Sequence, residues 1–215
     1  SGADQMKVSM VIPAYYINED FVKMTANCLN SMGDEKPDEI IVVDDHSPIE
    51  HEFDGVINIR RAKNGRFPKA VNTGLRASTG DIIIVCNNDI TFYPGWLKGL
   101  KKVLKTCDIG SIRVTDSDGW ETHDVVTTGD RFGSIWAMKR HVYETLGGLD
   151  TDFALGSFED LDYYNRARKA GFSVGKYHGA LVEHIGRATN DVEFPNHEDF
   201  ETGKEVYRNK YGRID

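Results

Sequence analysis

The chain has 215 residues, of which 40% are hydrophobic and 28% are charged, a composition typical of a folded globular protein rather than a disordered one. The formal net charge of −8 disfavours a nucleic-acid-binding protein, because such proteins usually present a positive surface to phosphates. The cysteines Cys28, Cys86 and Cys107 lie far apart and form no Cys-x-x-Cys pair. This spacing excludes a disulfide framework and a zinc ribbon, and it fits a reducing compartment.

The first residues and the hydropathy of the chain indicate its domain bounds and its compartment. We expect residues 1–6, which open with Ser1-Gly2-Ala3, to be a cloning remnant or a disordered start, and residues 7–215 to form one domain. No apolar run approaches the roughly 18 residues that a membrane-spanning helix needs, and no signal peptide is visible. We therefore expect a cytoplasmic protein, with peripheral binding at a membrane surface left open, and the oligomeric state is undetermined.

The first half of the chain alternates short apolar strands with amphipathic helices. Strands are predicted at 8–12, 40–43, 57–61 and 82–85, and helices at 21–32, 68–80 and 94–107. Apolar strands that alternate with helices form parallel sheets covered on both faces. The pattern therefore predicts an α/β fold with a mostly parallel central sheet flanked by helices on both faces.

The second half of the chain is less regular. Strands are predicted at 109–114, 134–138, 173–177 and 180–184, and helices at 139–146, 158–170 and 198–211. Residues 115–130 form a polar segment in which Asp118-Gly119 signals a turn. This segment is the part of the chain whose sequence indicates least about its structure.

Polar or turn-forming residues follow three predicted strands at the point where each strand ends. They are Pro13-Ala14-Tyr15, Asp44-Asp45-His46-Ser47 and Asn87-Asn88-Asp89. Each cluster alone is compatible with a turn, because Asp, Asn and Ser side chains bond the nearby backbone. Ligands of α/β sheets bind at the carboxyl ends of strands, so three clusters at one edge favour a site. The sequence has no Gly-x-Gly-x-x-Gly turn after the first strand, no P-loop and no Gly-x-Ser-x-Gly elbow.

Six groups of residues then follow one another in an order that carries a resemblance. They are Val8–Tyr15; Ile40–Ser47; Asn64-Gly65-Arg66 with Ala70–Gly74; Asn87-Asn88-Asp89 with Pro94–Leu97; Gly147–Asp150 with Phe158–Asp162; and His184 with Gly186. Together they resemble family 2 glycosyltransferases with the GT-A fold, over about residues 7–211. The resemblance implies a single GT-A domain in which residues 7–107 bind the nucleotide and residues 108–215 bind the acceptor.

The resemblance also implies a reaction and its substrates. A metal-dependent, inverting enzyme of this kind moves a sugar from a UDP-, dTDP- or GDP-linked donor to a glycan or another hydroxyl acceptor, in polysaccharide or glycoconjugate synthesis. The residues implied in nucleotide binding are Pro13, Ala14, Tyr15, Asp44, Asp45, Asn64, Arg66, Lys69 and Asn88. A carboxylate accepts hydrogen bonds from a uracil-type N–H or from ribose hydroxyls, so Asp44 or Asp45 would bind the nucleoside, unless both cap the following turn. Arg66 and Lys69 would bind the diphosphate, or would be solvated charges.

A divalent cation is expected between Asp89 and His184. Such a cation neutralises the charge that develops on a leaving nucleoside diphosphate. The family's Asp-x-Asp signature reads Asn87-Asn88-Asp89 here, so this loop offers a single carboxylate. A mixed shell of carboxylate and imidazole suits Mn²⁺ somewhat better than Mg²⁺. The alternative for His184 is a strand-end histidine bonded to backbone.

Asp160 is the expected general base, because an inverting transfer needs a carboxylate to take the proton of the acceptor hydroxyl. Ser157-x-x-Asp160 also matches a capping box, in which Asp160 would bond backbone and Glu159 would be the base instead. On the acceptor side, we expect Trp120 and Trp136 to stack on sugar and Asp162 to orient the acceptor, unless Asp162 is merely solvated.

Two other classes of protein stay open. A nucleotidyltransferase that makes a nucleotide sugar usually has a glycine-rich, basic loop after its first strand, which Pro13-Ala14-Tyr15-Tyr16 lacks. A non-catalytic nucleotide-sugar-binding module would keep the fold without the chemistry, and Asn87 keeps this alternative open. Release of nucleoside diphosphate, of pyrophosphate, or of neither distinguishes the three classes.

Overall fold

The computed structural model describes residues 6–129, 132–154, 157–186, 192–193 and 195–212. The strands are β1 (Val8–Ala14), β2 (Glu39–Asp44), β3 (Ile57–Arg60), β4 (Ile82–Cys86), β5 (Ile90–Phe92), β6 (Ile109–Val114), β7 (Val126–Thr128), β8 (Ile135–Lys139) and β9 (Val174–His184). The helices are α1 (Glu19–Ser31), α2 (Arg66–Ala77), α3 (Trp96–Val103), α4 (Thr115–Asp118), α5 (Arg140–Leu146), α6 (Glu159–Lys169) and α8 (Glu198–Tyr211).

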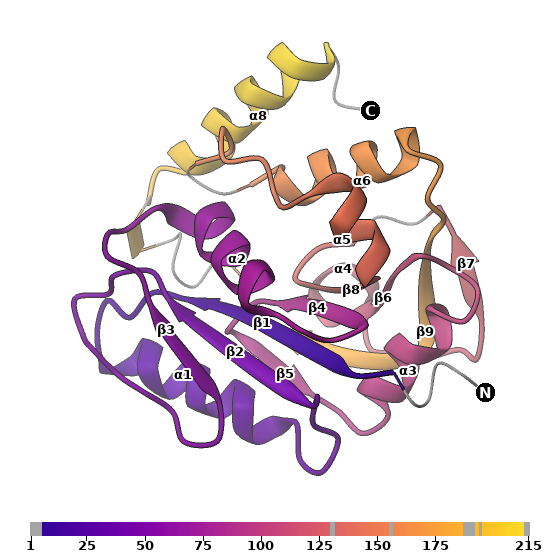
Figure 1. Cartoon of the computed structure of the whole chain (residues 1–215), viewed down its shortest axis with the longest axis horizontal. Helices are drawn as coiled ribbons and strands as arrows, with labels where there is room; N and C mark the ends of the chain where they lie inside the picture. The colour runs from indigo at the N-terminus through magenta and orange to yellow at the C-terminus, as the bar shows by residue number, and fades with distance from the viewer. Residues whose placement is uncertain (1–5, 130–131, 155–156, 187–191, 194, 213–215) are drawn as a thin grey trace.

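The strands form one nine-stranded sheet in the order β3-β2-β1-β4-β8-β6-β9-β5, with β7 paired to β9 as well (Figure 1). β1 to β4 pair in parallel, whereas β8 runs antiparallel to β4 and β6, and β5 and β7 run antiparallel to β9. Because β6 is parallel to β9, six of the nine described strands share one direction. The predicted α/β fold with a central sheet is confirmed, and each antiparallel pairing involves β8 or β9 of the carboxyl half.

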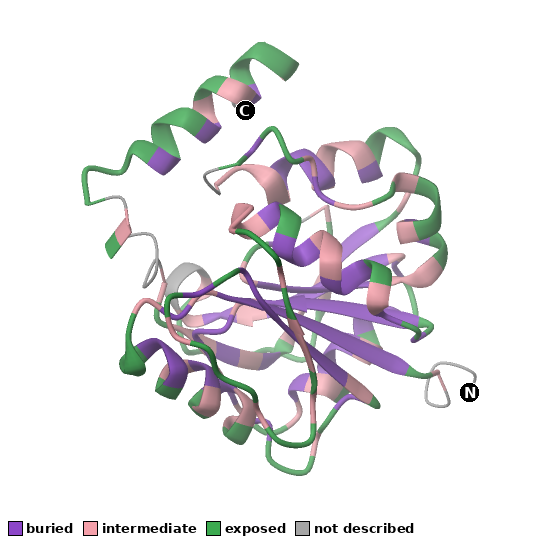
Figure 2. Cartoon of the chain, turned by 60° about the vertical axis from the view of Figure 1, so that its left-hand side comes forward, coloured by how far each residue is buried: buried purple, intermediate pink, exposed green. Residues whose placement is uncertain are grey.

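Helices cover the sheet on both faces, and each face has its own hydrophobic core (Figures 1 and 2). α1 and α3 cover one face, where Val22, Cys28 and Leu100 are buried, while α2, α5 and α6 cover the other face. Full burial of a Val or Leu side chain contributes roughly 1.5–3 kcal/mol, so both layers are stabilised by many such side chains. α8 lies outside these layers and packs on α6 through a small cluster around Tyr207 (Figure 1).

Two predicted strand boundaries differ from the structure. Pro13 does not end β1, because the Ala14 carbonyl accepts a hydrogen bond from Asp45 N–H at 2.9 Å and therefore faces β2. Pro13 then faces the β4 side, where pairing with β4 has already stopped at Val11, so its missing N–H is not needed. The two strands predicted at 173–177 and 180–184 form the single strand β9, whose pairing with β6 shifts at a bulge.

The start of the chain is only partly as expected. Residues 1–5 lie outside the described residues, whereas Met6 is half-buried and packs against the core on the α1 face, so it belongs to the folded part.

All three cysteines are free and buried. Within the described ranges, the structure contains no helix whose length and apolarity would let it cross a bilayer.

Candidate active site

A cleft of about 490 Å³ opens at the carboxyl ends of β1, β2 and β4, where the polar clusters were predicted to meet. Both halves of the chain contribute to its walls. The residues from the amino half are Pro13, Ala14, Tyr15, Asp45, Asn64, Arg66, Phe67, Ala70, Asn87, Asn88 and Asp89. Those from the carboxyl half are Phe132, Gly133, Ser134, Trp136, Leu149, Ser157, Phe158, Glu159, Asp160, Leu161, His184, Glu193 and Phe200.

The two aspartates that follow β2 have different surroundings. Asp44 Oδ1 accepts a 2.8 Å hydrogen bond from Ser47 N–H, and its Oδ2 pairs with Arg60, so Asp44 caps the turn and is not among the cleft residues. Asp45 lines the cleft and accepts bonds from Arg61 Nη1 at 2.6 Å and from Gly65 N–H at 3.0 Å. Burial raises the pKa of Asp45, although these donors oppose the rise. Asp45, rather than Asp44, is therefore the carboxylate available to a ligand.

The start of α2 brings a cation to the cleft. Arg66 adopts a left-handed backbone conformation with φ of 69°, and its N–H donates to Asn64 Oδ1 at 3.0 Å. The Arg66 guanidinium pairs with Glu193 at 2.7 Å. Lys69 is exposed and does not line the cleft, so the structure separates the two cations that the sequence grouped together. Asn88 lines the cleft and donates to Thr25 Oγ1 at 3.0 Å.

Pairing of β5 with β9 brings Asp89 and His184 together, because Ile90 lies opposite His184 in the sheet. His184 Nε2 lies 3.1 Å from Asp89 Oδ1 and 3.3 Å from Asn87 Nδ2. Asp89 Oδ1 is buried without a hydrogen bond of good geometry, so the close imidazole satisfies the distance of an ion pair but not the alignment of a hydrogen bond. A buried carboxylate oxygen beside an imidazole is the donor pair that Mn²⁺ accepts.

This pair fits a cation that takes its other ligands from a substrate. Among the described residues, no group of three or more His, Cys, Asp or Glu side chains could enclose a metal by itself. Two protein donors in an open cleft leave room for phosphate oxygens. The residues present therefore fit a metal shared between protein and nucleotide.

The α6 helix begins in the cleft with Glu159 and Asp160. The predicted capping box does not form: the N-cap is Phe158 with φ of 69°, and no side chain caps the helix. Ser157 also has a positive φ, and its Oγ lies 3.4 Å from Asp199 Oδ2 on α8. Asp160 is thus presented to the cleft, with Oδ1 accepting from the N–H of Leu161 at 2.7 Å.

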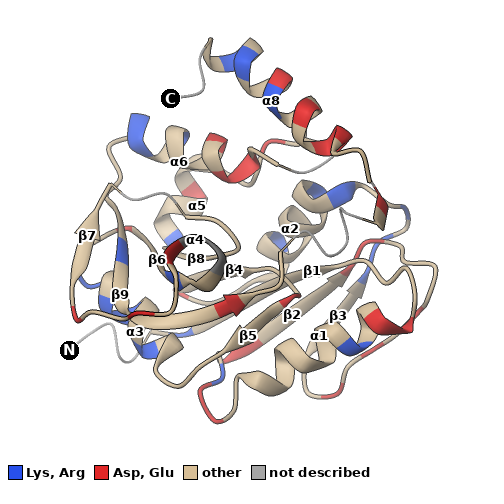
Figure 3. Ribbon diagram, turned by 180° about the vertical axis from the view of Figure 1, so that it is seen from behind, with Lys and Arg blue, Asp and Glu red and all other residues tan. Residues whose placement is uncertain are grey.

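The surroundings of Glu159 favour the protonated form of its carboxyl group. Its Oε2 is buried without a hydrogen-bond partner, and burial together with the negative charges of Asp160 and Asp199 raises the pKa of Glu159 to about 8. Figure 3 shows acidic residues gathered at the starts of α6 and α8. In its protonated form this carboxyl group donates a hydrogen bond, whereas Asp160 Oδ1 accepts one from the N–H of Leu161, so the two neighbouring acids have different surroundings.

The three residues expected on the acceptor side lie in different places. Trp136 on β8 lines the cleft and stacks on Phe132, with ring centroids 4.6 Å apart. Trp120 is 60% exposed, lies edge-on to Tyr93 and is not among the cleft residues. Asp162 is fully buried outside the cleft lining, which leaves no solvated or acceptor-facing oxygen.

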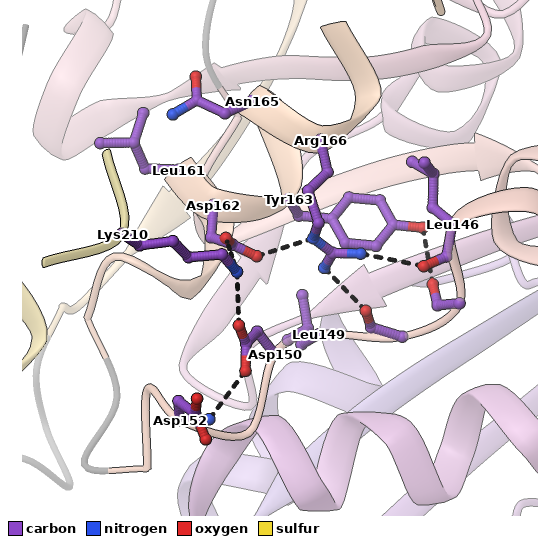
Figure 4. A network of polar contacts seen from close by, with 12 residues as sticks. Leu146, Leu149, Asp150, Asp152, Leu161, Asp162, Tyr163, Asn165, Arg166 and Lys210 are labelled. Atoms are coloured by element: carbon purple, nitrogen blue, oxygen red, sulfur yellow. Dashed lines mark hydrogen bonds and ion pairs between the residues drawn. The ribbon is translucent and has the colours of Figure 1, made fainter. Parts of the chain in front are cut away.

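Asp162 instead joins α6 to α8 (Figure 4). Its Oδ2 accepts from Arg166 Nε at 2.8 Å, and its Oδ1 accepts from Tyr211 OH at 2.7 Å. Lys210 Nζ lies 2.7 Å from the same Oδ1 and 2.5 Å from Asp150 Oδ2. Asp162 therefore holds the carboxyl-terminal helix on the helix that carries Asp160.

Sequence reasoning missed several cleft residues. Phe132, Glu193 and Phe200 line the cleft from segments without a motif, and no local sequence signal indicates them. Phe158 lies inside a segment that the resemblance did include, and its ring packs on Phe200 with centroids 5.1 Å apart. The carboxyl half thus contributes several aromatic rings to the lining of the cleft.

Solved structures of glycosyltransferases share this fold. GalNAc-T7, crystallised with UDP, GalNAc and Mn²⁺, matches with a TM-score of 0.71 at 15% identity over 83% of this chain and 43% of that one. Residues 1–349 of S. aureus TarS match with a TM-score of 0.64 at 14% identity over 96% of this chain and 73% of that one. The Pyrobaculum calidifontis mannosyltransferase PcManGT, in complex with GDP-Man and Mn²⁺, matches with a TM-score of 0.57 at 21% identity, over 83% and 56% of the two chains. This chain thus spans less than two thirds of GalNAc-T7 and of PcManGT.

Two sequence comparisons identify the family. The chain is 26% identical over 194 residues to a protein of Bacillus subtilis (strain 168) named "Uncharacterized glycosyltransferase YwdF", covering 76% of this chain and 69% of that protein. The model of the family described as "Glycosyl transferase family 2" matches residues 9–164, which include the strand-end clusters and the start of α6. The predicted enzyme class is confirmed: the chain is a glycosyltransferase with the GT-A fold and belongs to glycosyl transferase family 2.

Proposed function

We propose that the chain is a divalent-metal-dependent, inverting glycosyltransferase that moves a sugar from a nucleoside-diphosphate donor to a hydroxyl acceptor in polysaccharide or glycoconjugate synthesis. The observation that carries this proposal is that Asp89, His184 and Asp160 line one cleft, with Asp89 Oδ1 and His184 Nε2 only 3.1 Å apart. A metal-type donor pair and an acidic group at a helix start are the two features that such a transfer needs.

On the donor side, Asp45 would accept hydrogen bonds from the nucleoside, beside Pro13, Ala14 and Tyr15. Arg66 would exchange its partner Glu193 for the diphosphate, because a phosphate carries more charge than a carboxylate. Neighbours of the same fold were crystallised with UDP or GDP-Man, which supports a nucleoside diphosphate as the ligand class.

Asp89 and His184 would hold Mn²⁺ or Mg²⁺. A bound divalent ion supplies charge neutralisation for the leaving diphosphate. The presence of Mn²⁺ in the crystals of GalNAc-T7 and PcManGT supports manganese.

On the acceptor side, Asp160 would take the proton of the acceptor hydroxyl as its oxygen attacks the anomeric carbon. The new bond forms on the face opposite the departing diphosphate, so the configuration inverts and the bond from carbon to phosphate oxygen breaks. Protonated Glu159 would donate a hydrogen bond to a sugar hydroxyl, and Trp136 would offer an aromatic wall to the substrate. The three free cysteines support a reducing compartment, the cytoplasm, for this reaction.

A thermal-shift screen of UDP-, GDP- and dTDP-linked sugars with and without MnCl₂, followed by product analysis, tests the proposal. At a concentration 100-fold above Kd, a ligand stabilises the folded state by about 2.7 kcal/mol. We expect metal-dependent stabilisation by one donor class and release of nucleoside diphosphate. Release of pyrophosphate would indicate a nucleotidyltransferase, and stabilisation without turnover would indicate a binding module; either outcome contradicts the proposal.

A further inference from the structure

Asn72, in the middle of α2, forms two hydrogen bonds with the backbone of a residue 77 positions away. Its Nδ2 donates to the Leu149 carbonyl at 2.8 Å, and its Oδ1 accepts from the Leu149 N–H at 2.8 Å. A Cβ on Gly148 would lie only 2.1 Å from Asn72 Oδ1, so this close approach requires glycine at 148. The Asn72 amide thus pairs with Leu149 as a neighbouring strand would.

The loop that contains Leu149 is held on its other side by α6 (Figure 4). Arg166 donates from Nη1 to the Leu146 carbonyl at 3.0 Å and from Nη2 to the Gly148 carbonyl at 2.8 Å. Tyr163 OH donates to the Gly147 carbonyl at 3.2 Å. All of these hydrogen bonds go to backbone carbonyls, so residues 146–149, at and just after the end of α5, lie between α2 and α6.

The two helices that this loop separates both begin in the cleft. α2 starts at Arg66 on the nucleotide side, and α6 starts at Glu159 and Asp160 on the acceptor side. Tyr163 lies one helical turn beyond Asp160, so a shift of the loop against α6 would move the carboxylates. Leu149 itself lines the cleft and is buried.

We propose that Asn72 is a positioning residue, which holds α6 at a fixed distance from α2 and thereby places the Asp160 carboxylate against the nucleotide side of the cleft. The spacing of α2 and α6 is inferred from the hydrogen bonds alone. Its effect on turnover rests on the proposed function. A displacement of about 1 Å at a reacting centre can lower the rate about a hundredfold. Loss of the two hydrogen bonds between Asn72 and Leu149 is therefore expected to lower the reaction rate.

The chain contains a matched control for Asn72. Asn58 on β3 forms the same pair of bonds with Phe53, accepting from its N–H at 3.0 Å and donating to its carbonyl at 2.8 Å. Neither Asn58 nor Phe53 is among the cleft residues. The same substitution at both sites therefore distinguishes two effects. One is the loss of two hydrogen bonds between an asparagine and a backbone, and the other is the loss of the spacing between α2 and α6.

The test compares Asn72→Asp with Asn58→Asp. Each change keeps the size of the side chain and the hydrogen bond that its Oδ1 accepts from the backbone N–H. It replaces the Nδ2 donor by a carboxylate oxygen, which repels the backbone carbonyl. Native-state hydrogen exchange measures the opening of α6. Steady-state release of nucleoside diphosphate from the donor that the screen identifies measures turnover. UDP with MnCl₂ serves as the probe of nucleotide binding by titration.

We expect Asn72→Asp to raise exchange of the α6 amides at least about tenfold and to lower kcat at least about tenfold, since each such factor equals about 1.4 kcal/mol. The donor KM and the UDP–Mn²⁺ affinity should stay within about twofold of wild type, because neither Asn72 nor Leu149 is among the residues proposed to bind the nucleotide. Asn58→Asp should leave both α6 exchange and kcat unchanged.

Faster exchange confined to residues 146–150, or equal effects of the two substitutions on α6, would overturn the proposal. If Asn72→Asp does not fold, Asn72→Ala removes both bonds without adding charge and is judged by the same criteria. If the wild type turns over no donor, the proposed function fails, and the exchange measurement still decides whether Asn72 spaces the helices.

Discussion

The carboxylates that follow β2 and those at the start of α6 have opposite charge surroundings. On the nucleotide side, Asp44 is paired with Arg60 and Asp45 with Arg61. On the acceptor side, burial raises the pKa of Glu159 to about 8, and the negative charges of Asp160 and Asp199 add to this rise. Arginine thus neutralises the negative charge after β2, whereas negative charges gather around Glu159.

This difference separates a binding surface from a proton-transfer site. Carboxylates paired with arginine keep a fixed geometry, as ligand recognition requires. Burial beside like charges raises the pKa of a carboxyl group, and such a perturbed pKa is typical of acid–base sites. The comparison predicts that substitutions on the acceptor side change turnover, whereas those on the nucleotide side change binding.

The largest effect should come from Asp160. Asp160→Asn removes the proposed base without changing size, so kcat should fall by roughly 10²–10⁴-fold, the usual contribution of general base catalysis. UDP–Mn²⁺ affinity should stay within about twofold of wild type, because recognition of the nucleotide does not use this carboxylate. Steady-state kinetics and titration measure the two quantities. Asp152→Asn, in an exposed loop, is the control, and an Asp160→Asn enzyme with unchanged kcat would contradict the assignment.

Asp162 should matter for stability more than any surface charge. Asp162→Asn leaves Arg166 and Lys210 beside a neutral amide, and removing one partner from a buried ion pair costs about 3–5 kcal/mol. Asp20→Asn breaks the exposed pair with Lys23 and should cost less than about 1 kcal/mol. Urea unfolding measures both variants. Equal midpoints for the two would show that the buried contact between α6 and α8 contributes little.

On the nucleotide side, His184→Ala should weaken Mn²⁺ binding at least about tenfold, the lower end of the losses seen even for indirect metal contacts. Titration of MnCl₂ in the presence of UDP measures this affinity. His141→Ala, on a half-exposed histidine that the cleft does not include, is the matched control. Unchanged manganese affinity in His184→Ala would place the cation elsewhere in the cleft.

The smallest effect concerns the proton on Glu159. Its folded pKa is raised from 4.5 to about 8, so between these values the unfolded state has lost a proton that the folded state keeps. Stability from this group is therefore complete below about pH 4.5, declines as pH rises toward 8 and levels off above it. Glu159→Gln removes the decline and should raise Tm at pH 8.5 by at least about 2–4 °C, the shift produced by 1 kcal/mol in a domain of this size. Parallel pH dependence of Tm in wild type and Glu159→Gln would contradict this.

Hydrophobic periodicity determined the α/β class, because strands and helices that bury an apolar face against a sheet need apolar residues at fixed spacing. The strand-end clusters likewise indicated where the cleft lies, since parallel strands end at one edge. The order of motifs from Val8 to His184 pointed to the family that the comparison confirms. The fold class, the place of the cleft and the family motifs can all be recognised from residues that are close together in the sequence.

The tertiary structure alone decided which polar side chains are available to a ligand. Asp44 and Asp45 are adjacent in sequence, yet Arg60 and Ser47 engage the first and leave the second at the cleft. Asp162 is buried because Lys210 and Tyr211 arrive from α8, and Asn72 meets Leu149 from 77 residues away. Hydrogen-bond partners and burial come from segments far apart in the chain, and these set the charge and direction of each side chain, so local sequence does not contain them.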